Sequence, residues 1–356
     1  MSRCVPAGTL NRRPTVSVVV PCYNYARYLV ECVETVLSQE DVDPEVIIVD
    51  DASTDASATV AEALATADNR VRVIRHPINR GHIATYNDGL AEATGDYVVL
   101  LSADDLLLPG SLARATALLD ANPSVGMVYG HPTHLYEGTK PKPPRTRVRN
   151  WTIWSGPEWI RLRCRAGINC IFNPEVVLRT SVQREIGGYR SDLPHSGDLE
   201  MWMRAASVAD VGRVNGADQA YYRVHAASMQ RTVYAGHLTD LQARWDAFRV
   251  VLTEHAEGIP GSGEMLATVQ RTLANEALGQ ISRIYSDGRE DPDADLVDSY
   301  LQFARELYPD TPALSAWRTI PVARRTGEHR SAVAALNAYR TIEDKIRWRR
   351  WRWNGV

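Results

Sequence analysis

The chain has 356 residues, 44% of them hydrophobic, so it is long enough to bury the core of one large domain and a second, smaller one. This composition excludes a wholly disordered chain. The formal net charge of -3 gives no global reason to expect a nucleic acid partner, so any nucleotide site must be local.

The amino-terminal segment carries three arginines within residues 1–13 but no apolar run and no small-residue cleavage site. We expect a short leader that lies outside the first domain and does not direct secretion. No window approaches 18 continuous apolar residues, so no transmembrane helix is expected. The sequence therefore predicts a cytoplasmic protein, or one attached peripherally to the inner face of a membrane.

Residues 14–130 alternate short runs of valine, isoleucine and leucine with helical stretches, as βα units around a mostly parallel sheet do. Near-continuous apolar runs are typical of strands buried on both faces. The expected strands are 16–20, 46–49, 71–74, 97–101 and 125–129. The expected helices are 28–37, 54–67 and 83–93, and another begins near 109–112. In such a domain the ligand binds at the carboxyl ends of the strands.

The rest of the chain divides into two parts. Residues 131–235 are expected to complete the α/β domain, and within them the proline-rich and basic segment 137–150 predicts a mobile loop that covers an acceptor site. Residues 236–356 show amphipathic helices separated by turns rich in glycine and proline. They predict an all-helical C-terminal region.

The first two predicted strands end in polar residues at the same edge of the sheet. The first runs into Pro21, Tyr23 and Asn24, and the second is followed by Asp51. A carboxylate there can accept the imide N–H of uracil or thymine, and an aromatic ring can stack on the base. The alternative is that Asp51 only caps the helix that follows it.

The fourth predicted strand ends in Ser102, Ala103 and the pair Asp104–Asp105. Adjacent carboxylates repel each other unless a cation or hydrogen bonds compensate them. Mg²⁺ and Mn²⁺ take carboxylate and phosphate oxygens and can neutralise a diphosphate as it leaves. The alternative is a pair of solvated aspartates in a turn.

Six short motifs in this order resemble the nucleotide-binding half of the inverting glycosyltransferases of family 2, which have the A-type (GT-A) fold. The motifs are Val18–Asn24, Val49–Asp55, Asn79–Gly81, Asn87, Gly95–Tyr97 and Ala103–Asp105. The resemblance implies a GT-A-type mostly parallel sheet flanked by helices, and a nucleotide diphosphate sugar as donor. Uridine and thymidine diphosphates fit Asp51 best, and guanine remains an alternative base. The resemblance covers about 90 residues.

The resemblance also implies roles for single residues. Pro21 and Tyr23 would flank the base, Asp51 would bind its edge, and Asp104 would lie near the ribose. Asp105 would hold a divalent metal, Mn²⁺ or Mg²⁺. Asn24, Gly81, Asn87 and Ala103 complete the implied donor site. Two positions depart from the family pattern, because Ser102 stands where members commonly have aspartate, and Tyr86 stands where they commonly have arginine.

The acceptor half of the resemblance covers residues 170–232. Gly187–Arg190 followed by Ser196–Arg204 resembles the segment that carries the catalytic base in relatives, and Asp198 occupies the matching position. In an inverting transfer one base takes the proton of the acceptor hydroxyl while its oxygen attacks the anomeric carbon. The alternatives are that Asp198 caps a helix over 199–206 and that Glu200 is the base.

The segment Tyr221–His225 resembles one that closes the active site in relatives, where the histidine can meet the metal or the diphosphate. His225 is therefore a candidate metal ligand. The alternative for a lone histidine is an ordinary core or surface position.

The segment 345–353 is basic and rich in tryptophan, as the interfacial zone of an anionic membrane requires. On a helical wheel Ile342, Ile346 and Trp353 share one side, whereas Trp348 and Trp351 fall on the other. A peripheral membrane contact is one interpretation, and packing of the tryptophans against the catalytic domain is the other.

Together these features predict a metal-dependent inverting glycosyltransferase with a catalytic domain over 14–235. Within it, 14–130 would bind the nucleotide sugar and 131–235 would supply the acceptor site and the base. The acceptor could be a saccharide, a lipid-linked molecule or a small molecule. The competing functions are a catalytically silent nucleotide-sugar-binding scaffold and a sugar nucleotidyltransferase, although the latter usually carries a glycine-rich phosphate loop after the first strand.

Overall fold

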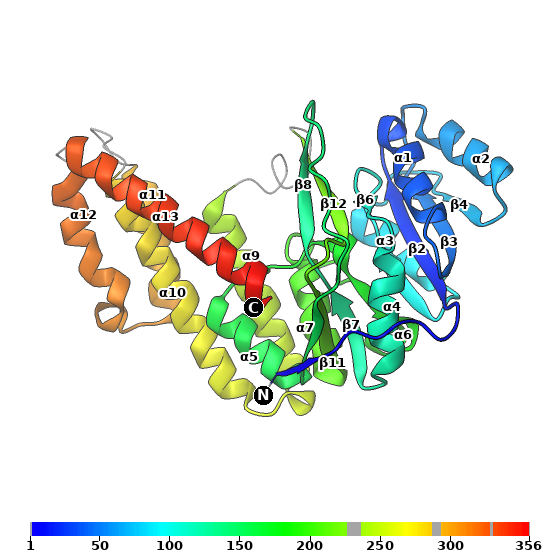
Figure 1. The fold of residues 1–356 in the computed structure, drawn as a ribbon. Helices are drawn as coiled ribbons and strands as arrows, with labels where there is room; N and C mark the ends of the chain where they lie inside the picture. Colours follow the sequence, from blue (N-terminus) through cyan, green and yellow to red (C-terminus); the bar gives the residue numbers. More distant parts are fainter. Residues whose placement is uncertain (1, 226–235, 287–292, 328–329, 356) are drawn as a thin grey trace. The chain divides into compact units, whose positions relative to one another are not determined.

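The computed structural model describes residues 2–225, 236–286, 293–327 and 330–355 (Figure 1). They form two compact units. The first comprises Met1–Ile160 and Ile171–Val233, and the second comprises Arg161–Cys170 and Tyr234–Val356. A short segment within the expected catalytic domain, 161–170, thus belongs to the second unit.

The first unit is built on a nine-stranded sheet in the order β1-β9-β11-β7-β10-β5-β2-β3-β4. The strands are β1 (Arg3–Val5), β2 (Thr15–Cys22), β3 (Asp43–Asp50), β4 (Val71–Arg75), β5 (Tyr97–Leu100), β7 (Val125–Tyr129), β9 (Asn150–Trp154), β10 (Val177–Arg179) and β11 (Asp210–Asn215). Strands β5, β2, β3 and β4 are parallel, as are β7 and β11, whereas β10, β9 and β1 pair antiparallel. The α/β fold expected from the sequence is confirmed. Because β1 pairs with β9, residues 3–5 of the expected leader are an edge strand of this sheet.

Helices cover both faces of the parallel strands. They are α1 (Ala26–Leu37), α2 (Ser57–Ala67), α3 (His82–Ala91), α4 (Ser111–Ala121), α6 (Thr180–Ile186) and α7 (Gly197–Val208). Helix α5 (Gly156–Ala166) begins in the first unit and ends in the segment 161–170 that belongs to the second. Val18 of β2 shares a buried core with Leu29 of α1, which explains why the strand is apolar on that face. On the other face α3 lies so close that a Cβ at Gly89 would be 2.3 Å from Val19 Cγ1. This close contact sets the distance between α3 and β2.

A three-stranded sheet adjoins the large one in the same unit, in the order β6-β12-β8. Its strands are β6 (Leu106–Leu107), β12 (Ala220–Val224) and β8 (Pro132–Tyr136). The loop between β8 and β9, which we expected to be mobile, is anchored to this unit. Asp218 forms an ion pair with Arg145, and the Tyr221 hydroxyl donates to the carbonyl of Lys142 at 2.6 Å.

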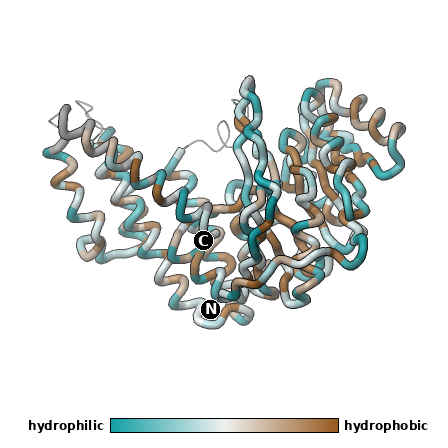
Figure 2. Tube along the Cα trace, in the orientation of Figure 1, coloured by the Kyte–Doolittle hydropathy of each residue, from teal (hydrophilic) through white to brown (hydrophobic). Residues whose placement is uncertain are grey.

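The second unit is helical, as expected for the C-terminal region. Its long helices are α9 (His237–Glu254), α10 (Ser262–Ser286), α11 (Ala294–Leu307), α12 (Ile320–Gly327) and α13 (Arg330–Asn354). Figure 2 shows apolar and polar positions alternating along these helices, and in α10 the apolar side includes the buried Val269, Leu273 and Ala277. None of the helices in the described part of the chain has the length and apolarity needed to span a bilayer.

Candidate active site

The carboxyl ends of β2 and β3 are tied together by Asn24. This residue has a left-handed backbone conformation, with φ 59°. Its Oδ1 accepts the backbone N–H groups of Thr54 at 2.8 Å and Asp55 at 3.2 Å, and its own N–H donates to Ser53 Oγ at 3.0 Å. Tyr23 beside it is 45% exposed. The Asn24 amide oxygen is therefore used within the protein, and the Tyr23 ring is the accessible group at this strand end.

Asp51 directly follows β3 and holds the turn that begins α3. Its buried carboxylate accepts the backbone N–H groups of Arg80 at 2.7 Å and Gly81 at 2.9 Å, and His76 Nδ1 lies 2.7 Å from Oδ1. Burial favours the neutral acid, but these hydrogen bonds outweigh it and hold the pKa of Asp51 below its ordinary value. Helix α2 has Ala56 as its N-cap, so the alternative that Asp51 caps this helix is wrong.

His76 is a buried residue of this site that the sequence did not reveal. Its Nε2 lies 3.0 Å from Asp88 Oδ2, so the ring links Asp51 to Asp88. Arg80 forms an ion pair with the same Asp88 carboxylate. The available signal was the position of His76 immediately after β4, at the same sheet edge as the other strand ends.

The end of β5 brings Asp104, Asp105 and His225 together. His225 Nε2 lies 2.9 Å from Asp104 Oδ2, and both residues are buried. Asp105 Oδ1 accepts the backbone N–H of Arg223 at 2.8 Å, and Arg223 Nε donates to the Asp104 carbonyl at 2.7 Å. Ala103 is fully buried, so only its backbone is available to a ligand. The residues expected near the ribose (Asp104) and at the metal (Asp105 and His225) thus occupy one place, although 121 positions separate His225 from Asp104 in the chain.

The charges of the buried Asp104–Asp105 pair favour the binding of a cation. Burial and the neighbouring Asp104 charge raise the pKa of Asp105 well above its ordinary value. The His225 Nδ1 atom is buried without a hydrogen-bond partner. Within the described ranges no group of three or more His, Cys, Asp or Glu side chains is already arranged around a metal position. A divalent ion here would take part of its coordination from ligand oxygens.

Asp198 lies in the first turn of α7, in a cluster with Asn173 and Tyr189. Both side chains hydrogen-bond its carboxylate, and Tyr189 Oη lies 3.3 Å from Asn173 Oδ1. Asp198 is half-buried, and the loss of water around its carboxyl raises its pKa to about 6 in spite of these hydrogen bonds. The N-cap of α7 is Ser196, so the alternative that Asp198 is the cap is wrong.

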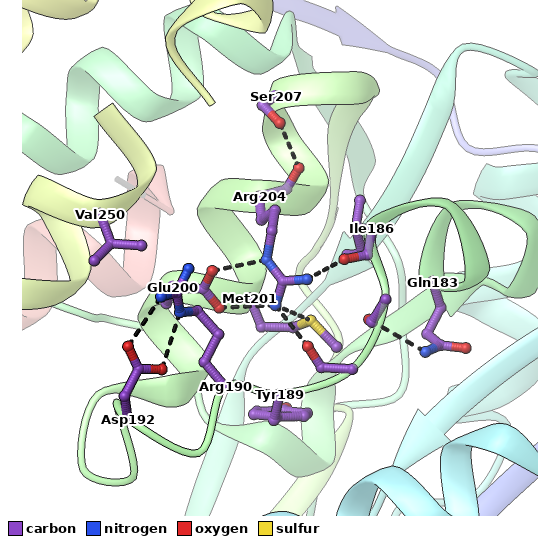
Figure 3. A network of polar contacts seen from close by, with 12 residues as sticks. Gln183, Ile186, Tyr189, Arg190, Asp192, Glu200, Met201, Arg204, Ser207 and Val250 are labelled. Carbon is purple, nitrogen blue, oxygen red and sulfur yellow. Dashed lines mark hydrogen bonds and ion pairs between the residues drawn. The ribbon is translucent and has the colours of Figure 1, made fainter. Parts of the chain in front are cut away.

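Glu200, the competing base, is committed to an ion pair (Figure 3). Its two carboxylate oxygens accept from Arg204 Nε at 2.7 Å and Nη2 at 2.8 Å. Arg204 also donates to the carbonyls of Ile186 and Gly188, and the Glu200 side chain is fully buried. A carboxylate held in this way fastens the loop before α7 and has no access to an acceptor hydroxyl.

Asn87 joins α3 to the segment that carries Tyr189. Its Nδ2 donates to the Tyr189 carbonyl at 2.9 Å, and its Oδ1 accepts the Tyr189 N–H at 2.7 Å. The approach is so close that a Cβ at Gly188 would lie 2.4 Å from Asn87 Oδ1. The sequence placed Asn87 in the donor site, but its side chain positions Tyr189 beside Asp198.

Comparisons with known sequences agree on one family. The family model described as Glycosyl transferase family 2 matches residues 17–177. The chain is 38% identical over 119 residues to the glycosyltransferase GlyG of Streptococcus pneumoniae, covering 33% of this chain and 40% of that protein. It is 30% identical over 198 residues to the putative glycosyltransferase EpsE of Bacillus subtilis, covering 55% of this chain and 68% of that protein. The match to GlyG thus spans less than half of that relative's length.

Two solved structures have a similar fold at low sequence identity. TarS from Staphylococcus aureus in complex with UDP-GlcNAc has a TM-score of 0.60 and 18% identity, covering 88% of this chain and 90% of its own. The mannosyltransferase PcManGT from Pyrobaculum calidifontis, in complex with GDP-Man and Mn²⁺, has a TM-score of 0.50 and 18% identity, covering 94% and 90%. These likenesses support the expected GT-A-type sheet.

Proposed function

The chain belongs to glycosyltransferase family 2, and from this premise we propose that it transfers a sugar from a nucleotide diphosphate sugar to an acceptor hydroxyl with inversion. The observation that carries the proposal is the separation of two acidic centres within one domain. The Asp104–Asp105 pair lies beside His225, whereas Asp198 has different partners, Asn173 and Tyr189, and a pKa of about 6. One centre suits the leaving diphosphate and the other suits proton transfer.

The proposed donor carries a uridine or thymidine diphosphate. The Tyr23 ring would stack on the base beside Pro21, and Asp51 would accept the base N–H through a remaining lone pair. A carboxylate has about four acceptor positions, so the two backbone groups and the His76 ring leave capacity for a ligand. The UDP-GlcNAc complex of the structurally similar TarS supports a uridine donor.

We propose Mn²⁺ or Mg²⁺ as the cofactor, held by Asp105 and His225 together with oxygens of the donor diphosphate. The residues fit such an ion because two buried carboxylates are adjacent, so that burial and the Asp104 charge disfavour the ionised form of Asp105, and because His225 Nδ1 is buried without a hydrogen-bond partner. When bound, the ion would offset the negative charge that develops on the leaving diphosphate. The Mn²⁺ complex of the structurally similar PcManGT supports this assignment.

In the proposed reaction Asp198 accepts the proton of the acceptor hydroxyl while that oxygen forms a bond to the anomeric carbon. The bond from that carbon to the diphosphate oxygen breaks at the opposite side, so the nucleoside diphosphate leaves with the bonding electrons. Asn173 and Tyr189 hold the Asp198 carboxylate in place. A base with a pKa near 6 is mostly ionised at neutral pH and still accepts a proton readily.

A thermal-shift panel of nucleotides and nucleotide sugars, with and without Mn²⁺, tests the function. A ligand that binds only the folded state raises the apparent melting temperature by mass action. We expect a UDP or dTDP compound to raise it, and more strongly with Mn²⁺. No shift with any nucleotide diphosphate would refute the proposal, whereas binding without turnover would favour the silent scaffold.

A first prediction concerns Asp51. Asp51→Asn should weaken binding of the free nucleoside diphosphate by about 1.5 to 3 kcal/mol, the value of one hydrogen bond to a charged group. Isothermal titration calorimetry measures it. Asp88→Asn is the matched control because it disturbs the same network through His76 and Arg80 without touching the base. Equal losses in both variants would mean that Asp51 only holds the turn at residues 80 and 81.

We also propose that α13 contacts an anionic membrane surface. Trp351 is buried, whereas Trp348 on the same side of the helix is 39% exposed, so only Trp351 packs within the protein. The opposite side of α13 is exposed, and its apolar side chains lie within about 60° of one another on a helical wheel. Its apolar residues are Tyr339, Ile342, Ile346 and Trp353, and the exposed basic residues beside them are Lys345, Arg349 and Arg350. An apolar stripe flanked by cations suits the interfacial zone.

A second prediction follows for α13. The protein should sediment with vesicles that contain phosphatidylglycerol and much less with pure phosphatidylcholine, and salt should weaken the binding. Ile342→Ser with Ile346→Ser should lower the partition coefficient by more than about tenfold, because each isoleucine loses its apolar burial. Sedimentation that ignores lipid charge, or that survives the double substitution, would argue against the contact.

A further inference from the structure

The small sheet β6-β12-β8 has two chemically different faces. One face contributes Leu106, Leu108, Leu135 and Tyr221 to a buried cluster. Because side chains alternate along a strand, the intervening residues point the other way. On that second face Tyr222 pairs with His134, and Val224 pairs with Tyr136.

Aromatic rings gather on this second face. Phe172 lies on it, with its ring centroid 4.6 Å from that of Tyr222 and 5.7 Å from that of His134. The rings of His134 and Tyr136 are 6.1 Å apart. None of the four residues is fully buried, and Tyr136 is 53% exposed. We call these four residues the aromatic platform. A sheet face turned to water is normally polar, so an aromatic one indicates a binding surface.

Two residues of the platform are direct sequence neighbours of residues that contact the acidic centres. Asn173, the residue after Phe172, hydrogen-bonds Asp198. Arg223, the residue after Tyr222, donates its backbone N–H to Asp105 Oδ1 at 2.8 Å. Phe172 is thus one residue from a partner of the proposed base, and Tyr222, whose ring is tilted against that of Phe172, is one residue from a partner of the proposed metal ligand. A molecule lying on these rings could place a group at Asp198.

We propose that the aromatic platform is the acceptor subsite and that it binds a saccharide. A pyranose ring presents C–H groups on its face, which the electron-rich faces of aromatic rings attract, and hydroxyls on its rim. The proposal rests on the proposed function and specifies its acceptor, which the sequence left open among saccharide, lipid-linked and small-molecule types.

The polar groups at the platform favour a sugar over an acyl chain. The hydroxyl of the exposed Tyr136 can bond to hydroxyls of a ligand. Burial lowers the pKa of His134, so a charged ring is disfavoured on the platform. A pocket for ligands of this kind combines aromatic surface with a few polar groups, whereas a lipid tail would need none of them.

A glycan array probed with the full chain, in the presence of UDP and Mn²⁺, tests the proposal. We expect retention on a subset of oligosaccharides. Titration with a retained oligosaccharide should then show about tenfold weaker binding for Phe172→Leu and for Tyr136→Ser, because each loses one stacking ring. Val322→Ser on α12 is the matched control, since Val322 is an apolar residue as exposed as Tyr136, at 54%, and lies outside every proposed site.

The outcomes separate this proposal from the function itself. UDP affinity should be unchanged in the platform variants, because the expected nucleotide site lies at Asp51. If the wild-type chain binds UDP but no oligosaccharide, or if Phe172→Leu and Tyr136→Ser bind as well as Val322→Ser, the platform is not a saccharide subsite. If no nucleotide binds, the proposed function fails first.

Discussion

Replacing Asp198 by asparagine is expected to slow sugar transfer by about 10² to 10⁴, the usual effect of losing a general base. Asparagine keeps the size of the side chain and an oxygen that can accept from Asn173 or Tyr189. The free enzyme's affinity for the nucleotide should not change. Steady-state rates and calorimetry on the same preparation measure both quantities.

The pH dependence gives a second readout for the same residue. The pKa of Asp198 is raised to about 6, so the carboxylate that accepts the proton is lost as the pH falls through that value. We expect kcat/KM of the wild type to drop about tenfold per pH unit below about 6 and the residual activity of Asp198→Asn to lack this limb.

Stability should respond in the opposite sense. A raised pKa means that the folded protein loses stability as the pH rises from the ordinary aspartate value towards about 6, because the charged form is disfavoured on folding. At neutral pH Asp198→Asn removes that penalty, so its melting temperature should equal or exceed that of the wild type. A large fall in melting temperature would assign Asp198 a structural role.

Glu200→Gln is the matched control for Asp198→Asn. It neutralises a carboxylate two residues away, but that carboxylate is paired with Arg204 in a buried site. Breaking one partner of such a pair costs about 3 to 5 kcal/mol of stability. We therefore expect Glu200→Gln to have a lower melting temperature than the wild type but the same fall of kcat/KM below about pH 6. A collapse of turnover in Glu200→Gln, with normal turnover in Asp198→Asn, would move the base to Glu200. Retention of anomeric configuration in the product, read by NMR, would exclude the single displacement altogether.

The local sequence pattern predicted the parallel strands because each strand is a short apolar run that helices bury on both faces. The run from Val16 to Val20 is apolar since β2 is covered on both faces, by α1 on one side and by Gly89 of α3 on the other. The clustering of Asp51 and Asp104 at the same edge follows from parallel strands alone.

Side-chain partners were not predictable in the same way. The Asp51 carboxylate bonds to residues about 30 positions later, and Glu200 is occupied by Arg204 only because the loop before α7 brings carbonyls to the guanidinium. The aromatic platform combines residues from β8, β12 and the segment before β10, and no single stretch of sequence contains it. These features depend on tertiary contacts between distant segments.

The remaining prediction concerns Asp105 and the metal. Chelation should abolish wild-type turnover, and Mn²⁺ or Mg²⁺ should restore it, because without the ion the charge on the leaving diphosphate is not offset. Asp105→Asn should lower turnover by about 10³ or more at every metal concentration, which corresponds to the several kcal/mol that a metal supplies. Full turnover in excess chelator would contradict the metal requirement.

A readout independent of turnover comes from the melting temperature. Asparagine keeps the oxygen that accepts the Arg223 N–H. It also removes a buried carboxyl whose raised pKa shows that its charged form is disfavoured on folding. Without metal, Asp105→Asn should therefore be at least as stable as the wild type. Mn²⁺ added with UDP should raise the melting temperature of the wild type but not that of the variant. Glu31→Gln is the control, because Glu31 pairs with the same Arg223 at an exposed position and does not contact the carboxylate pair. Since exposed ion pairs contribute little, Glu31→Gln should keep both the metal response and the turnover. If it loses them as Asp105→Asn does, the effect arises from moving Arg223, and Asp105 is not the ligand.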